Sequence, residues 1–200
     1  MALCETVLTL KIVVCGEGGV GKTTIINGFT GSPVSIGETP ATVGINFATR
    51  TVSTSSRIIN LQIWDFGGQE QFRFFLPDFC KGALGCLVIF DLTRYATFER
   101  IYDWLKVIEE NVKGIPRVLV GNKADKKESR AVDRSVIDSL VVKEKFSAYY
   151  ETSAKTGQNI AEPFAILTLI ILKCLETVSL DIEKCADISL DQPLNKNSDR

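Results

Sequence analysis

A glycine-rich segment between an apolar run and a helical pattern most constrains how this chain can fold. Residues 16–23 read Gly-Glu-Gly-Gly-Val-Gly-Lys-Thr, a complete G-x-x-x-x-G-K-T motif that follows the apolar residues 8–15. Glycines let successive backbone N–H groups surround phosphate oxygens, and a helix beginning at about Lys22 turns its positive dipole end toward them. Lys22 adds a charge toward the β- and γ-phosphates, and the Thr23 hydroxyl is an oxygen ligand for Mg²⁺.

This motif predicts a site for nucleotide phosphates, because it lies between a strand and a helix as such a site requires. The alternative is a glycine-rich strand-to-helix turn that merely contains a lysine. The candidate binding residues are Gly16, Gly18, Gly19, Val20, Gly21, Lys22, Thr23 and Thr24. The motif alone selects neither a base nor a reaction.

The rest of the chain alternates short apolar runs with longer helical patterns. We expect strands at 8–15, 45–52, 57–64, 84–90, 118–120 and 149–150, with the second and third forming a hairpin. Helices are expected from about residue 22, over 95–112, over 133–146 with Asp133 as N-cap, and over 159–178 with Pro163 in the first turn. Loops are expected at 30–44 and 66–77. The alternation predicts an α/β fold, a mostly parallel sheet with helices on both faces and ligands beyond the carboxyl ends of the strands.

Composition and charge exclude several classes of protein. The chain has 200 residues, so we expect one domain over 1–178 and a flexible tail over 179–200. A net charge of −1 predicts no nucleic-acid partner, and the absence of histidine excludes histidine triads and histidine zinc sites. The most apolar stretch, 164–172, is shorter than the roughly 20 residues of a membrane span. No signal peptide is evident, so we expect a soluble, cytoplasmic monomer. The six cysteines form no C-x-x-C pair, which favours buried, reduced thiols.

A second motif, Trp-Asp-Phe-Gly-Gly-Gln-Glu, occupies residues 64–70 after an apolar strand. Asp65 at the strand end can hold Mg²⁺ through water, and the N–H of Gly68 can approach a γ-phosphate. Gln69 can orient a water molecule through its amide without titrating. In isolation the segment also fits an ordinary acidic turn.

Two further motifs point to guanine. In Asn122-Lys123-Ala124-Asp125, the Asp125 carboxylate can accept both N–H groups on the guanine edge, while the Lys123 stem covers the base. A base without that pair would leave the carboxylate unpaired, at a cost of about 1–3 kcal/mol. Residues 151–155 read Glu-Thr-Ser-Ala-Lys and supply the candidates Ser153, Ala154 and Lys155, of which the Ala154 N–H can donate to guanine O6. Each motif alone fits a polar turn, but both follow predicted strands in the order that a guanine site requires.

With these motifs in place, residues 8–178 resemble the small GTPases of the Ras superfamily, and most closely the Rab branch. The Rab-like segments are 42–47 (Thr-Val-Gly-Ile-Asn-Phe), 61–65 (Leu-Gln-Ile-Trp-Asp), 69–73 (Gln-Glu-Gln-Phe-Arg), 81–83 (Lys-Gly-Ala) and 90–93 (Phe-Asp-Leu-Thr). In one departure, Gly67 precedes Gly68, as in Arf and heterotrimeric G proteins.

The resemblance implies a P-loop NTPase fold with a six-stranded sheet and one antiparallel edge strand. It also implies binding of GTP or GDP with Mg²⁺ and slow GTP hydrolysis. The implied catalytic residues are Lys22, Thr42, Gly68 and Gln69, and the implied metal ligands are Thr23, Thr42 and Asp65. Effectors, exchange factors and GTPase-activating proteins would bind the two switch loops, and a partner's arginine would raise the rate by about 10³–10⁵-fold. We expect Arg50, Arg57 and Arg73 to be surface charges and not internal substitutes for that arginine.

Two further departures from the family pattern lead to predictions about nucleotide release and lipid anchoring. Residues 30–42 contain no aromatic side chain to pack across the guanine edge, so we expect faster nucleotide release than in typical relatives. The chain has neither a C-terminal prenylation motif nor an N-terminal Met-Gly, which predicts no direct lipid anchor unless Cys174 or Cys185 is acylated.

Other interpretations remain open at this point. A GTP-binding scaffold that does not hydrolyse nucleotide is the alternative to a switch, whereas an ATPase or kinase is disfavoured by Asn122, Lys123 and Asp125. Several apolar residues would form the surface that partners recognise, or else would pack within the core. They are Ile45, Phe47, Trp64, Phe72 and Phe75.

Overall fold

The computed structural model describes residues 7–32, 44–54, 57–68 and 76–175. They contain a six-stranded sheet in the order β2-β3-β1-β4-β5-β6. The strands are β1 (Val7–Cys15), β2 (Ile45–Ser53), β3 (Ile58–Phe66), β4 (Gly85–Asp91), β5 (Arg117–Asn122) and β6 (Ala148–Glu151). Only the β2–β3 pair among these is antiparallel, so the predicted sheet with one antiparallel edge strand is confirmed.

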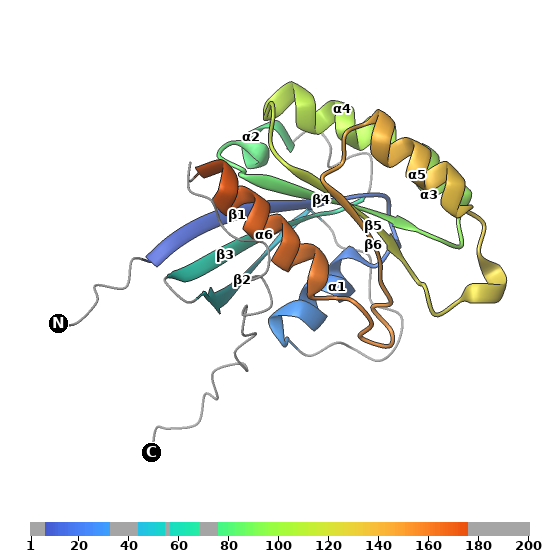
Figure 1. The fold of residues 1–200 in the computed structure, drawn as a ribbon, viewed down its shortest axis with the longest axis horizontal. Coiled ribbons are helices and arrows are strands. Elements are labelled where there is room, and N and C mark those ends of the chain that lie inside the picture. Colours follow the sequence, from blue (N-terminus) through green and yellow to red (C-terminus); the bar gives the residue numbers. More distant parts are fainter. Residues whose placement is uncertain (1–6, 33–43, 55–56, 69–75, 176–200) are drawn as a thin grey trace, which may run out of the picture.

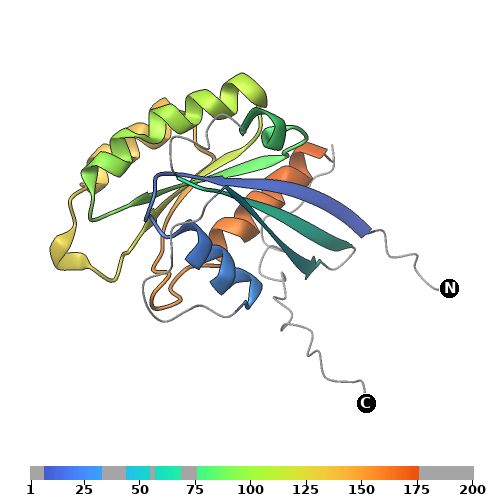
Figure 2. The same cartoon turned by 180° about the vertical axis from the view of Figure 1, so that it is seen from behind.

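Helices cover both faces of this sheet (Figure 1). Helices α1 (Lys22–Thr30) and α6 (Glu162–Leu175) lie on one face. The other face carries α2 (Leu76–Cys80), α3 (Tyr95–Glu99), α4 (Ile101–Asn111) and α5 (Arg134–Lys143), as Figure 2 shows from behind. No helix of the described residues has the length and apolar character needed to cross a membrane.

Side-chain alternation along the central strands builds a core on each face. In β1, Ile12 and Val14 pack beneath α1 and α6, whereas Val13 and Cys15 pack beneath α2 and α4. Every residue of β4 is buried. Strands covered on both sides require continuous apolar sequence, and this requirement is why the runs at 8–15 and 84–90 predicted strands correctly.

Several local predictions need correction. The helix expected over 95–112 is divided at Arg100, whose ψ of −4° departs from helical geometry and whose N–H is shared between the carbonyls of Ala96 and Phe98. Asp133 occupies the N-cap position of α5 but makes no side-chain cap bond. The short helix α2 and the 3₁₀ turn Lys127–Ser129 were not predicted.

Of the cysteines, Cys15, Cys80 and Cys86 are buried free thiols as expected, but Cys174 is exposed. Cys4, Cys185, the segment 176–178 and the tail 179–200 lie outside the described residues.

Candidate functional site

The four sequence motifs meet at one edge of the sheet, where the parallel strands β1, β3, β5 and β6 end. The phosphate loop, residues 16–21, follows β1, and Asp65 lies near the end of β3 in register with Val14. Asn122 ends β5. We call the phosphate loop with Lys22, Thr23, Asp65 and Gly68 the phosphate end of the site. The base-reading end comprises Asn122, Lys123, Asp125, Ser153 and Ala154.

Close backbone approaches explain the glycines of the phosphate loop. Gly16 has φ +140°, and a Cβ there would lie 2.0 Å from the Ile89 carbonyl oxygen. Gly21 has φ +96°, and a Cβ there would lie 2.4 Å from the side-chain nitrogen of Asn122. Larger side chains at these positions would force the loop away from β4 and from the base-reading end.

Lys22 lies folded against this loop and is only 6% exposed. Its Nζ donates to the carbonyl oxygens of Gly16 at 2.7 Å and Glu17 at 3.0 Å. Burial lowers the pKa of Lys22, and the nearby Asp65 carboxylate opposes that shift. The phosphate end therefore holds a desolvated cation whose partners are neutral carbonyls, a weaker match than a phosphate anion.

Thr23 and Asp65 form the second polar contact at this end. The Thr23 hydroxyl donates to Asp65 Oδ2, while Asp65 Oδ1 is buried and finds no hydrogen-bond donor among the described residues. Asp65 is 2% exposed, and burial raises its pKa. A hydroxyl oxygen beside an incompletely satisfied carboxylate suits a hard cation such as Mg²⁺.

The two residues after β3, Gly67 and Gly68, lie directly against the phosphate loop and the residue before β2. A Cβ on Gly68 would lie 2.2 Å from the Gly18 nitrogen, so only glycine permits this approach. The Gly67 N–H donates to the Gly44 carbonyl at 2.9 Å, which joins the end of the first loop to the start of the second. Thr42 and Gln69, both predicted to be catalytic, lie outside the described residues.

Asn122 joins the two ends of the site. It is 1% exposed, and its amide nitrogen donates to the Val20 carbonyl at 2.7 Å. Its Oδ1 accepts the Thr152 hydroxyl at 3.2 Å and the Ala154 N–H at 3.1 Å. The Ala154 N–H expected to meet guanine O6 thus already has a partner here, and a base would have to share or replace that bond.

Asp125 is oriented by the Ser153 hydroxyl, which donates to its Oδ1 at 2.6 Å. Lys123 takes a left-handed backbone with φ 68°. Lys155 is exposed and borders a hollow of about 510 Å³ between α1, β2 and the loop 154–161 that leads into α6. Thr24, another sequence-predicted residue, lies half-buried on α1.

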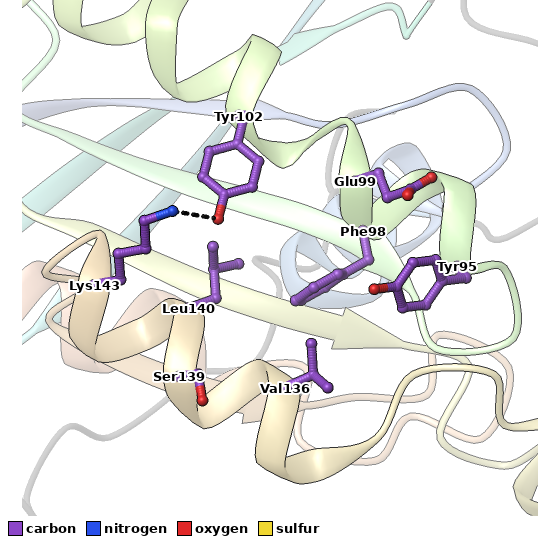
Figure 3. Close-up of a pocket in the computed structure, with 8 residues that line it drawn as sticks. All are labelled: Tyr95, Phe98, Glu99, Tyr102, Val136, Ser139, Leu140 and Lys143. Atoms are coloured by element: carbon purple, nitrogen blue, oxygen red, sulfur yellow. Dashed lines mark hydrogen bonds between the residues drawn. The ribbon is translucent and has the colours of Figure 1, made fainter.

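A second hollow, of about 450 Å³, lies between α3, α4 and α5 (Figure 3). Lys143 on one wall donates to the Tyr102 hydroxyl at 3.2 Å on the other. None of its lining residues belongs to the four motifs. It is lined by Tyr95, Phe98, Glu99, Tyr102, Val136, Ser139, Leu140 and Lys143.

Arg94 is the residue at this site that the sequence did not indicate. Among the arginines considered, Arg50 lies over the Phe29 ring at 4.7 Å, Arg57 borders the hairpin and Arg73 lies outside the described residues. Arg94 instead reaches the phosphate loop, where its Nη2 donates to the Gly18 carbonyl at 2.8 Å. No local sequence signal marked Arg94, because its contact with the phosphate loop depends on β4 lying beside β1 in the sheet.

The fold and the motifs together define a P-loop, GTP-binding protein. A family model described as the Ras family matches residues 11–173. The Arabidopsis thaliana Ras-related protein RABA1g is 36% identical over 174 residues, 86% of this chain and 79% of the relative. Ras-related protein Rab11B of Nicotiana tabacum is 34% identical over 192 residues, 94% and 87% of the two chains. Bovine Ras-related protein Rab-13 is 37% identical over 168 residues, 81% and 79%.

The chain therefore belongs to the Ras family of GTP-hydrolysing small GTPases, and within it is Rab-like. The predicted resemblance is confirmed.

Proposed function

We propose that this protein is a molecular switch of the signalling or trafficking type, which binds GTP or GDP with Mg²⁺ and hydrolyses GTP slowly. The observation that carries the proposal is the buried 2.7 Å hydrogen bond from Asn122 to the Val20 carbonyl. It ties the base-reading end to the phosphate loop, so one nucleotide can contact both. Two loops that the γ-phosphate orders and hydrolysis releases would then form the switch.

The residues present fit Mg²⁺. The Thr23 hydroxyl and the Asp65 oxygen that finds no donor among the described residues are hard oxygen donors of the kind that this ion prefers. Thr42 would be a further ligand. The described residues contain no cluster of three or more His, Cys, Asp or Glu side chains able to hold a metal. Thr23, Asp65 and Thr42 would hold the ion, which when bound would supply positive charge that offsets the charge of the phosphates.

The chain's own groups would divide the remaining work. Backbone N–H groups of the phosphate loop would cradle the phosphates, and the Lys22 ammonium would exchange carbonyl partners for β- and γ-phosphate oxygens. Gly68 would place its N–H at the γ-phosphate, and Gln69 would orient the attacking water. At the other end, Asp125 would accept the two guanine N–H groups.

Partners would recognise an aromatic surface beside the switch loops. Phe47 is 53% exposed, and its ring meets the Trp64 ring at 5.1 Å. Trp64 in turn contacts the Phe79 ring at 5.5 Å. Phe72 and Phe75, also expected on this surface, lie outside the described residues. Effectors and regulators that bind here would read the nucleotide state, and a partner's arginine would accelerate hydrolysis.

Nucleotide selectivity and turnover test the proposal. Purified protein with Mg²⁺ would be incubated with equimolar GTP and ATP, and bound nucleotide and released phosphate followed over hours. We expect GTP-selective binding with slow phosphate release, and Gln69→Ala should lose release while keeping binding. Gln158→Ala, at an exposed position, is the matched control. Binding without release, indifferent to Gln69, would mark a scaffold, and equal ATP binding would contradict the proposal altogether.

A change of base specificity is the sharper test. Xanthine carries a carbonyl where guanine carries its exocyclic amino group. A side chain that binds this edge of xanthine must therefore accept a hydrogen bond from N1–H and donate one to the carbonyl. Asp125→Asn supplies that pattern. We expect the variant to prefer XTP over GTP, and Asp138→Asn, a surface control paired with Arg134, to leave GTP preference unchanged. An Asp125→Asn variant that keeps the GTP preference would refute the assigned role of Asp125.

A further inference from the structure

Arg94 uses two edges of its guanidinium to join two parts of the chain. Its Nη2 donates to the Gly18 carbonyl at 2.8 Å, and its Nε donates to Asp91 Oδ2 at 2.8 Å. The residues Gly18 and Arg94 are 76 positions apart in sequence. The Arg94 side chain is 46% exposed, yet its guanidinium is held by both a carboxylate and a backbone carbonyl.

Asp91 relays this contact to the base-reading end. It ends β4 in register with Asn122, which brings the next residue, Lys123, within reach. The Lys123 ammonium contacts Asp91 Oδ2 at 2.6 Å. Burial would raise the pKa of Asp91, but hydrogen bonds from Lys123, Thr93 and Arg94 together bring it below its usual value. The Asp91 carboxylate is therefore ionised and forms ion pairs with both Arg94 and Lys123.

Holding the Gly18 carbonyl also fixes the adjacent N–H. In a trans peptide the carbonyl of one residue and the N–H of the next point in opposite directions. With the Gly18 oxygen turned toward Arg94, the Gly19 N–H must point away from Arg94. Because both residues are glycines, this peptide would otherwise flip at little cost. The Arg94 guanidinium also lies 3.5 Å from where a Cβ on Gly19 would be.

We propose that Arg94 is a positioning residue, which locks the Gly18–Gly19 peptide for binding the β- and γ-phosphates and couples it through Asp91 to Lys123. This role rests on the proposed function and adds a bridge from Arg94 through Asp91 to Lys123, parallel to the Asn122 bond. It makes affinity for nucleoside diphosphates and triphosphates depend strongly on Arg94. Affinity for a monophosphate, which lacks the β- and γ-phosphates, should depend on Arg94 only weakly, because Lys123 contacts Asp91 directly.

Competition binding of GMP, GDP and GTP to the full chain tests this role. Arg94→Ala is expected to weaken binding of GDP and GTP about tenfold, because the partly exposed charged hydrogen bond to the Gly18 carbonyl is lost. Binding of GMP should weaken less than about twofold. Arg94→Lys is expected to remain weak, because one ammonium cannot reproduce the two-edged guanidinium contact. Arg100→Ala, a half-exposed arginine paired with an aspartate three residues on, is the matched control and should bind like wild type.

Each of the other outcomes would refute the positioning role of Arg94, the proposed function, or both. Equal weakening of GMP, GDP and GTP would mean general loosening, and full recovery by Arg94→Lys would mean that charge alone matters; either refutes the positioning role. Wild-type affinities in Arg94→Ala would refute it while leaving the proposed function intact. Failure of the wild-type protein to bind any guanine nucleotide would overturn both.

Discussion

At the base-reading end of the site the polar groups bond to one another, whereas at the phosphate end some are buried without a full set of partners. Both oxygen and nitrogen of the Asn122 amide are engaged, and Asp125 is held by Ser153. By contrast, one oxygen of Asp65 lacks a donor among the described residues, and Lys22 is a buried cation whose hydrogen bonds go to carbonyls.

The difference separates recognition from switching. A closed hydrogen-bond network is rigid without ligand, so the base-reading end can discriminate bases at little cost in ordering. A buried charged group that lacks some of its hydrogen-bond or ionic partners binds favourably to a ligand that supplies them. The phosphate end therefore gains most from phosphate and Mg²⁺, and it adjoins the loops expected to change.

Lys22→Met should have the largest effect of these variants, a loss of nucleotide affinity at the phosphate end. Loss of the charge facing the phosphates should weaken GTP and GDP binding by about 100-fold or more. Because burial lowers the pKa of Lys22, its charge is unfavourable in the folded protein, and the nucleotide-free variant should be no less stable. Competition binding and urea unfolding measure the two effects, with the exposed Lys106→Met as control. A variant that loses both affinity and stability would contradict this separation.

Asn122→Ala should produce the opposite pattern at the base-reading end. It leaves the Val20 carbonyl and the Ala154 N–H without their buried partner, which should lower the free energy of unfolding by about 2–3 kcal/mol even without nucleotide. Asn111→Ala removes a comparable amide bond, to the Val107 carbonyl, at the helix surface and should cost less than about 1 kcal/mol. Equal urea midpoints for the two variants would show that the network is not closed.

Asp65→Asn tests whether the buried Asp65 carboxylate destabilises the nucleotide-free protein, through the pH dependence of the unfolding temperature. The pKa of Asp65 is raised above its ordinary 3.8, so the folded protein binds this proton more tightly than the unfolded chain. The group's contribution to stability is therefore full below that ordinary value and is lost as pH rises through the folded pKa. In nucleotide-free protein, Asp65→Asn should raise the unfolding temperature by about 2–4 °C near pH 7 and by almost nothing near pH 3. An unfolding temperature that rises equally at both pH values would mean that burial does not disfavour the ionised carboxylate.

Ser153→Ala should give the smallest effect. The variant removes the 2.6 Å bond that orients Asp125 but keeps the carboxylate itself. GTP affinity should fall about three- to tenfold, measured by the same competition assay. Ser139→Ala, which removes an exposed hydroxyl on α5, should bind GTP normally. No change in Ser153→Ala would indicate that Asp125 needs no orienting partner.

The element types and the motif positions were predictable because local rules govern them. Continuous apolar runs predicted β1 and β4, and Pro163 predicted the first turn of α6. The break at Arg100 was not predictable, because the 95–112 periodicity continues across it. Nor could spacing show that the Ala154 N–H donates to Asn122, since Asn122 ends β5 and Ala154 lies in the loop after β6.

The sequence by itself determined that a phosphate loop follows the first strand, because glycine conformational freedom and a helix N-terminus are local properties. It also determined the guanine-type motif through residue chemistry. Only the tertiary structure decided which of the arginines reaches the phosphate loop. That choice depends on β4 lying beside β1 and on Asp91 lying in register with Asn122. Contacts between residues 76 positions apart are set by strand pairing, which no local pattern records.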